Sequence, residues 1–319
     1  MHISTFTTVA LLGSCLCMSP FVKAQDYPAK PVRIVTAGAG AGTDYVARLM
    51  AAGLSERFKQ SFVVENRASG VITADTVAKA APDGHTLLSY GSTVWITPLL
   101  QQTPYDPVRD FAPITILGGS PHVIVVHPSL PVNSVKELIA LAKQKPGELN
   151  DASLGNGTST HLGAELFKSM AGVNIVRIPY KAGAQQMSDL IAGRAQLAFV
   201  TSASAMPHVK AGKLRAIGVT SAEPSILTPG LMPVAETVPG YTAGANYVMF
   251  APAKTSATIL RRLNQEAVEF LRTPSTKEAF LKLGLEANGS TAEQLAANMK
   301  SEMTRLGKVI KDNNIQGED

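Results

Sequence analysis

The segment Val32-Arg33-Ile34-Val35-Thr36-Ala37-Gly38-Ala39-Gly40-Ala41-Gly42-Thr43-Asp44 joins an apolar run to a glycine-rich loop and then to a helical pattern. The apolar run predicts a strand over Val32–Thr36. Apolar residues at helical spacing predict a helix over Thr43–Phe58. The residues of that apolar face are Val46, Leu49, Met50, Leu54 and Phe58. A strand, a glycine loop and a helix in this order begin a β-α-β unit with parallel strands and a right-handed crossover.

The same alternation continues along the chain and starts again near Val123. The first unit continues with a strand over Ser61–Glu65, a helix over Thr73–Ala80 and a strand over Thr86–Tyr90. In the second unit, Ser134 and Glu137 form a capping-box pattern for a helix that ends at Pro146-Gly147. Its later predicted strands are Leu149–Leu154, Ile175–Ile178, Gln196–Val200 and Leu214–Thr220, and its helices are Ser159–Ala171 and Gln185–Ala192.

The end of the chain is helical and has no sheet of its own. Helices are predicted over Ser256–Leu271 and Thr276–Leu283, and Ser290 with Glu293 forms a capping-box pattern for a last helix. We therefore expect an α/β protein of two lobes, with residues 25–122 and 246–319 in the first and residues 123–245 in the second. Strands within Ile114–Val126 and Tyr247–Ala251 would cross between the lobes, which would form a clamp around a ligand cleft.

The N-terminus has the pattern of an export signal. Residues 1–24 contain no acid, an apolar run from Val9 to Met18, and a small-residue cleavage pattern ending at Ala24. Both cysteines, Cys15 and Cys17, fall inside this segment, so a mature chain would have no disulfide and no thiolate site. Lipoprotein processing at Cys15 is a second interpretation, disfavoured because apolar residues follow it. We expect a periplasmic protein.

The charge balance weakly favours anionic ligands. The formal net charge is +5, and the signal segment contributes only Lys23 to it. The basic residues are scattered and aromatic residues make up only 6% of the chain, which argues against nucleic acid as a partner.

Four loops follow predicted strands, where helix N-termini would direct free N–H groups toward a ligand. The residues that we expect to line the ligand site are Gly40, Ala41, Thr43, Asp44, Ser92, Thr93, Ser153, Gly155, Asn156, Thr158, Ser159, His161, Tyr180 and Val200. The richest loop is Ser153–His161, which places glycines, an amide and hydroxyls before a helix. We expect Thr158 and Ser159 to donate hydrogen bonds to a ligand carboxylate.

Alternative interpretations of these loops remain open at the level of sequence. Asp44 is more simply a helix cap. Trp95 fits a pocket wall or the core equally well, and Tyr180 with Lys181 fits either a gate or ordinary packing. The first loop lacks the third glycine of a dinucleotide fingerprint, so we expect no such cofactor.

Catalytic and metal-binding patterns are missing from the sequence. No nucleophile elbow or zinc-protease motif is present. The histidines His85, His122, His127, His161 and His208 lack ligand spacing. We expect neither turnover nor a metal or other cofactor. An exported hydrolase that pairs Ser153, Ser159 or Ser92 with His161 or His85 is the alternative from another class.

Short motifs across Tyr27–Lys311 resemble a known family. They are Val64-Glu65-Asn66-Arg67, Pro82-Asp83-Gly84-His85-Thr86-Leu87-Leu88, Pro104-Tyr105-Asp106-Pro107, Asp110-Phe111-Ala112-Pro113, Gly155-Asn156-Gly157-Thr158-Ser159-Thr160-His161-Leu162, Glu165-Leu166-Phe167-Lys168, Pro179-Tyr180-Lys181, Gly212-Lys213-Leu214-Arg215-Ala216 and Ala251-Pro252-Ala253. The chain is similar in these motifs to the Bug-type, or TctC-type, extracytoplasmic receptors of tripartite tricarboxylate transporters.

The resemblance implies a type II periplasmic-binding-protein fold that closes on a small carboxylate. It also implies a partner, either the membrane permease subunits of a tripartite transporter or a sensor kinase, and we expect the receptor itself to be a monomer. This chain departs from the family at Val200, where an aspartate is common, and at Asn246, where an aromatic residue is common. Without a carboxylate at residue 200, the resemblance implies a carboxylate ligand that lacks an amino group.

Overall fold

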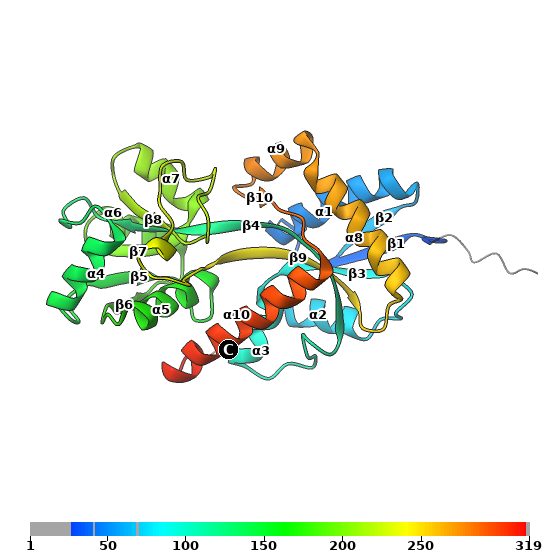
Figure 1. Cartoon of the computed structure of the whole chain (residues 1–319), viewed down its shortest axis with the longest axis horizontal. Helices are drawn as coiled ribbons and strands as arrows, with labels where there is room; N and C mark the ends of the chain where they lie inside the picture. The colour runs from blue at the N-terminus through cyan, green and yellow to red at the C-terminus, as the bar shows by residue number, and fades with distance from the viewer. Residues whose placement is uncertain (1–26, 41, 68–69, 317–319) are drawn as a thin grey trace, which may run out of the picture.

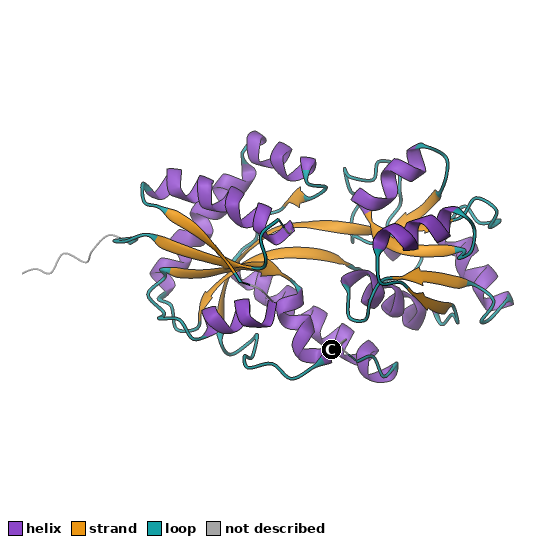
Figure 2. Cartoon of the chain, turned by 180° about the vertical axis from the view of Figure 1, so that it is seen from behind, coloured by secondary structure: helices purple, strands orange, loops and turns teal. Residues whose placement is uncertain are grey.

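Two α/β lobes lie side by side and are joined by two long strands (Figures 1 and 2). The computed structural model describes residues 27–40, 42–67 and 70–316, so the expected signal at residues 1–24 lies outside the described residues. The joining strands are β4 (Phe111–Val126) and β9 (Gly244–Pro252). The predicted two-lobed α/β fold with two crossing segments is confirmed. The exact lobe boundaries stay a prediction.

The first lobe is a mixed sheet covered by helices on both faces. Its strand order is β2 (Phe62–Asn66), β1 (Val32–Thr36), β3 (Thr86–Gly91), β9 and β4, with β1 parallel to both neighbours and β9 antiparallel to both of its own. Helices α1 (Gly42–Phe58), α8 (Ala257–Arg272) and α9 (Pro274–Lys282) share one apolar cluster. Helices α2 (Gly70–Ala78) and α3 (Thr93–Leu100) belong to the other.

The second lobe is built around the far end of β4. There β4 pairs antiparallel with β7 (Leu197–Thr201) and β8 (Arg215–Val219), and β5 (Asn150–Ser153) runs parallel to β6 (Val176–Pro179) and β7. Helices α4 (Val135–Gln144) and α5 (Ser159–Ala171) share a cluster with Ile124 and Phe199. Helices α6 (Gly183–Ile191) and α7 (Ser202–Lys210) pack with Val123 and Val200. Alternate residues of β4 and β7 therefore serve opposite faces of the sheet.

The crossing strands form an unbroken antiparallel ribbon, visible in the middle of Figure 1. Their pairing runs from Phe111 opposite Pro252 to Pro121 opposite Gly244, with two bulges. The last helix, α10 (Ala292–Asp312), spans the two lobes and packs against α3 and α5. A short strand, β10 (Glu286–Ala287), pairs with the edge of β4 beside the crossing.

Most predicted elements are present with small shifts at their ends, but some short elements were not predicted. Among the described residues these are α3, α7, β10 and a 3₁₀ helix, Val234–Glu236. Both α-helices contain a proline, Pro98 and Pro207, which interrupts the helical pattern in the sequence. No helix within the described residues combines the length and apolar character needed to span a bilayer.

The predicted capping box at Ser290 and Glu293 is wrong by one residue. Thr291 caps α10, and Gln294 completes the box. Ser290 instead bonds to β4, where its hydroxyl accepts from the backbone N–H of Ile116 at 2.9 Å. Because the Ser290 hydroxyl is bonded to β4, Thr291 is the residue that caps α10. The predicted cap Ser134 is confirmed, since its hydroxyl accepts from the backbone N–H of Glu137.

A buried bond between Trp95 and Glu302 ties α3 to α10. The indole Nε1 of Trp95 donates to Oε2 of Glu302 at 2.8 Å, and the Trp95 side chain is fully buried. Burial raises the pKa of Glu302, and the bond from Trp95 opposes that rise. The core interpretation of Trp95 is therefore correct.

We predict that Glu302→Ala lowers the free energy of unfolding by ~1–3 kcal/mol, because it leaves a buried indole N–H without an acceptor. Chemical denaturation followed by the fluorescence of the single tryptophan measures this loss. The matched control is Ser301→Ala, an exposed neighbour on the same helix, which should change stability by less than about 0.5 kcal/mol. Equal effects of the two substitutions would contradict the assigned role of the bond.

Candidate functional site

Strand ends and helix starts from both lobes converge on the crossing ribbon. In the first lobe, β3 ends at Gly91, which lies opposite Tyr247 of β9. In the second lobe, β7 ends at Thr201, which lies opposite His122 of β4. Helices α3 and α7 begin directly after these strands, and α1 and α5 begin after the neighbouring parallel strands. Free N–H groups of several helices thus face the space between the lobes.

The loop between β1 and α1 is held by Asp44. The Asp44 carboxylate accepts from the backbone N–H of Gly40 at 2.9 Å and from the Asn66 amide at 2.8 Å. Burial of this carboxyl opposes its ionisation, but these bonds and the Arg48 guanidinium together lower its pKa. Asp44 therefore shapes the loop, and its oxygens are already engaged.

The other predicted residues of this loop are placed differently. Gly40 is exposed and takes a φ of +81°, a left-handed conformation that favours glycine. The hydroxyl of Thr43 is buried and has no hydrogen-bond partner among the described residues. Ala41 lies outside the described residues. The end of the loop packs closely against the crossing ribbon. A Cβ at Gly42 would lie only 2.6 Å from the Tyr247 hydroxyl oxygen.

The loop between β3 and α3 contacts the ribbon through its backbone. The N–H of Ser92 donates to the carbonyl of Asn246 at 2.8 Å, and the Ser92 side chain is buried without capping its helix. Thr93 is half-buried and bonds to the Tyr90 hydroxyl. The backbone of Asn246 thus holds the start of α3 against the ribbon.

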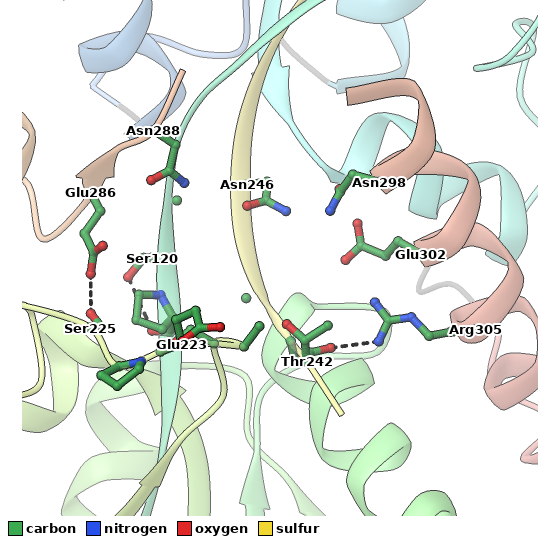
Figure 3. Close-up of a pocket in the computed structure, with 17 residues that line it drawn as sticks. Ser120, Glu223, Ser225, Thr242, Asn246, Glu286, Asn288, Asn298, Glu302 and Arg305 are labelled. Carbon is green, nitrogen blue, oxygen red and sulfur yellow. Dashed lines mark hydrogen bonds between the residues drawn. The ribbon is translucent and has the colours of Figure 1, made fainter. Parts of the chain in front are cut away.

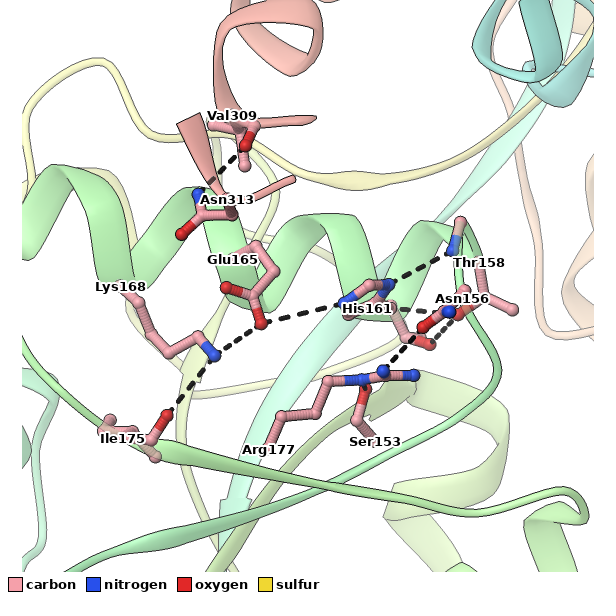
Figure 4. A network of polar contacts seen from close by, with 12 residues as sticks. Ser153, Asn156, Thr158, His161, Glu165, Lys168, Ile175, Arg177, Val309 and Asn313 are labelled. Atoms are coloured by element: carbon pink, nitrogen blue, oxygen red, sulfur yellow. Dashed lines mark hydrogen bonds and ion pairs between the residues drawn. The ribbon is translucent and has the colours of Figure 1, made fainter. Parts of the chain in front are cut away.

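The loop between β5 and α5 is built around Arg177, which sequence reasoning missed (Figure 4). The guanidinium donates to Ser153 Oγ at 3.1 Å, to Asn156 Oδ1 at 2.6 Å and to the carbonyl of Leu154 at 2.7 Å. Ser153 and Asn156, both predicted to contact ligand, are therefore turned toward Arg177. The sequence signal for this role was an arginine within the short strand Val176–Pro179, because a half-buried guanidinium needs several hydrogen-bond acceptors nearby.

Two more predicted ligand residues also support the loop. Thr158 caps α5: its hydroxyl accepts from the backbone N–H of His161 at 3.3 Å and donates to the carbonyl of Gly155 at 3.0 Å. His161 accepts from the backbone N–H of Gly157 at its Nδ1, 3.1 Å away. Burial, followed by the nearby Arg177 and Lys168 charges, lowers the pKa of His161 to about 3. The ring is therefore neutral at physiological pH, and its proton is on Nε2.

Ser159, the first residue of α5, is different from its neighbours in the loop. Its hydroxyl is half-buried and lies 3.2 Å from Nε2 of His122 on the crossing strand β4. A similar contact supports the next helix, where Ser202 Oγ at the start of α7 lies 3.2 Å from Ser120 Oγ of β4. The first residues of α5 and α7 therefore each contact a polar side chain of β4, one strand of the crossing ribbon.

A cavity of about 310 Å³ lies in the second lobe beside these helix starts. Val200, Thr160 and Met187 are among the residues that line it, together with the first residues of α6. Val200 is buried and gives this cavity an apolar wall. Tyr180 does not line it, because its hydroxyl donates to Asp189 at 3.0 Å and its ring is buried in the lobe. Lys181 is exposed.

A second cavity, of about 330 Å³, lies between the lobes and is lined by both (Figure 3). Asn246 of β9, Glu286 of β10 and three polar residues of α10 face it, and the loop after β8 lines one side. Its charged groups are Glu223, Glu286, Glu302 and Arg305. None of the predicted site residues lines this cavity. With acids in excess over bases, it is the less favourable of the two cavities for a carboxylate.

The structure pairs a serine with a histidine, but not in the combination that a hydrolase was expected to use. Ser159 contacts His122, whereas His161 binds the loop backbone. Burial lowers the pKa of His122 to about 4, which makes it a weak base. Its Nδ1 is buried without a hydrogen-bond partner among the described residues, so no acid orients the ring. Those residues also contain no cluster of three side chains suited to a metal ion.

Comparison with known proteins shows a consistent similarity. Residues 46–315 match the model of the tripartite tricarboxylate transporter family receptor, TctC. The protein BugT of Bordetella pertussis is 33% identical over 91% of each chain. A UPF0065 protein from Pseudomonas sp. (strain P51) is also 33% identical, over 89% of this chain and 86% of that protein.

Solved structures show the same similarity. The R. palustris protein Rpa4515 with adipate is 35% identical, with a TM-score of 0.70 over 92% of this chain and 100% of that one. The periplasmic binding protein BugD is 29% identical, with a TM-score of 0.66 over 92% of this chain and 100% of that one. A TctC solute-binding protein from Polaromonas, without ligand, is 23% identical and shares the fold, with a TM-score of 0.83 over 90% and 99% of the two chains.

Asp151 is a buried residue of β5, and its carboxyl should make the stability of the protein depend on pH. Burial raises the pKa of this carboxyl from its ordinary value of 3.8 to about 7, and the nearby Lys168 and Arg177 charges only partly oppose the rise. Between these two pH values the folded protein holds a proton that the unfolded chain has lost. This carboxyl therefore lowers stability progressively as pH rises from about 4 to 7.

We predict that Asp151→Asn gains stability relative to the natural chain as pH rises across that window, with no further gain above about pH 7. Denaturant titrations at several pH values measure the difference. Asp83→Asn is the control, because hydrogen bonds from His85 and Lys30 lower the pKa of Asp83 despite its partial burial. Its stability difference should stay constant over the same window. A pH-independent difference for Asp151→Asn would contradict the prediction.

Proposed function

Because the chain belongs to the tripartite tricarboxylate transporter receptor family, we propose that it is an exported solute-binding receptor that captures a small organic carboxylate between its two lobes. The mature chain would begin near residue 25 and act in the periplasm. It would pass its ligand to the membrane permease subunits of a tripartite transporter. Docking of the loaded receptor on a sensor kinase is the alternative that uses the same site.

The observation that carries this proposal is the convergence of neutral donors on the crossing ribbon. The starts of α1, α5 and α7 offer backbone N–H groups, and the half-buried hydroxyl of Ser159 adds a side-chain donor. Nearby charged groups already have partners inside the protein: Asp44 in the first loop, Arg177 in the third, and Glu302 and Arg305, which line a small pocket with Ser159. Several neutral donors with aligned helix dipoles stabilise a carboxylate without burying a counter-charge.

The ligand that fits this arrangement is a carboxylate without an amino group. An ammonium group needs an acceptor, and Val200 presents a buried apolar wall at the end of β7 instead. The cavity beside it would take an apolar body, to which Met187 also contributes. Adipate, found with the similar R. palustris protein, is a dicarboxylate of this kind.

Turnover is not part of the proposal. A serine nucleophile needs a basic histidine that an acid holds in orientation. His122, the histidine beside Ser159, has a lowered pKa and no acid at its Nδ1 among the described residues. We therefore assign the Ser159–His122 contact to binding.

A thermal-shift panel on residues 25–319 tests the function. A ligand that binds the folded state raises the melting temperature by mass action. We expect adipate, glutarate, citrate, benzoate or nicotinate to raise it, and glutamate and aspartate to have little effect. A shift with glutamate that exceeds the shift with glutarate would contradict the role given to Val200. The absence of a shift with every carboxylate would contradict the receptor proposal.

Ser159→Ala should weaken binding of the carboxylate found by the panel by ~10–100-fold, because it removes a hydrogen bond to a charged group. Calorimetric titration measures this loss. Thr158→Ala is the matched control: it removes the cap of α5 and should lower stability by ~1 kcal/mol. Its hydroxyl donates to Gly155, so affinity should fall less. Full affinity in Ser159→Ala would exclude Ser159 as a ligand donor.

A further inference from the structure

His122 is held rigidly on the crossing strand beneath the start of α5. Its side chain is fully buried, and its backbone N–H donates to Thr220 Oγ1 at 2.8 Å, while its carbonyl accepts from Thr220 at 2.9–3.0 Å. Nε2 of the ring lies 3.2 Å from Ser159 Oγ. Nδ1 faces the backbone of α5, where a Cβ at Gly163 would lie 3.5 Å from it. Ser159 is thus the hydrogen-bond partner of this ring among the described residues.

The tautomer of this ring decides which way the Ser159 proton points. A serine hydroxyl has one proton and two lone pairs. If Nε2 carried no proton, Ser159 would donate inward to it and would present only lone pairs to a ligand. If Nε2 carries the proton, Ser159 accepts from the ring and its own proton is free to point into the cleft.

The proposed ligand favours the proton on Nε2. Nδ1 has no hydrogen-bond partner among the described residues in either tautomer, as an N–H donor in one and as a lone pair in the other, so its burial does not choose between them. With the proton on Nδ1, Ser159 would direct oxygen lone pairs at a carboxylate, which has only lone pairs to offer in return. Burial lowers the pKa of His122 to about 4, so the ring is neutral and has a single proton to place.

We propose that His122 is a positioning residue that donates from Nε2 to Ser159 and so directs the Ser159 hydroxyl proton at the ligand carboxylate. The proposal rests on the carboxylate-binding function proposed above and adds a basis for its specificity. A hydroxyl committed as a donor binds a charged carboxylate more strongly than the neutral carbonyl oxygen of a carboxamide, and it rejects an ammonium, which can only donate.

Nitrogen NMR of the ligand-free protein labelled with ¹⁵N-histidine tests the tautomer directly. The signal missing from His122→Phe, or from His122→Gln if the first variant does not fold, identifies the residue. His161 is an internal standard for the Nε2–H form, because its Nδ1 accepts a backbone N–H. We expect His122 to give the same pattern as His161. A proton on Nδ1 of His122 would overturn the proposal, whether or not a ligand is known.

A double-mutant cycle tests the functional link, with adipate as the probe and its diamide, adipamide, as the neutral comparison. We expect Ser159→Ala, His122→Phe and the double variant to weaken adipate binding by a similar factor, ~10–100-fold, because the two residues act as one unit. The preference for adipate over adipamide should fall in all three. Additive losses, or an unchanged preference in His122→Phe, would contradict the proposal. If adipate and the other carboxylates all fail to bind the natural chain, the receptor function fails, and the NMR result alone decides the tautomer.

Discussion

The antiparallel pairing of β4 with β9 is the constraint on which the rest of the structure depends. The two strands share hydrogen bonds from Phe111 to Pro121 on one side and from Gly244 to Pro252 on the other. Because β4 belongs to the sheets of both lobes and β9 to the sheet of the first, the ribbon fixes where the neighbouring strands end. The ends of β3 and β7 lie against it, opposite Tyr247 and His122. The helices that follow must therefore start beside the same ribbon.

This arrangement explains how a protein with few free charges near its cleft can favour an anion. Backbone N–H groups and hydroxyls supply the donors, and the charged side chains closest to them are used to shape loops. Arg177 is an example of a charged side chain that shapes a loop, since its hydrogen-bond partners Ser153, Leu154 and Asn156 all precede α5. The cavity between the lobes, by contrast, is lined by three acids, Glu223, Glu286 and Glu302, and by one base, Arg305. It is therefore the less favourable of the two cavities for an anion.

The fold was largely predictable because its elements carry periodic apolar patterns that local rules can interpret. The ribbon was predicted from two apolar runs, although its strands extend to Phe111 and Gly244. Helices α3 and α7 were missed because a proline lies inside each of them, and β10 was too short to leave a pattern. The cap of α10 was misplaced because the tertiary bond between Ser290 and Ile116 cannot be known from the order of residues alone.

The loops of the site were predictable, but the direction of each side chain in them was not. The Ser153–His161 loop was identified from its composition, yet Ser153, Asn156 and Thr158 are used within the protein. Arg177, the partner of Ser153 and Asn156, lies 24 and 21 residues away from them in the sequence, and the pairing of Ser159 with His122 spans 37 residues. Such contacts are set by sheet register and by the helix starts that follow from it. Composition therefore indicated where to look for a site, while tertiary structure decides which hydroxyls already have partners inside the protein.

A crystal structure of the mature chain with a bound carboxylate would test this account most directly. The account predicts a carboxylate oxygen within hydrogen-bond distance of Ser159 Oγ and of backbone N–H groups at the start of α5, with the body of the ligand toward Val200. A carboxylate bound instead beside Glu223 and Glu286, away from Ser159 Oγ, would contradict it.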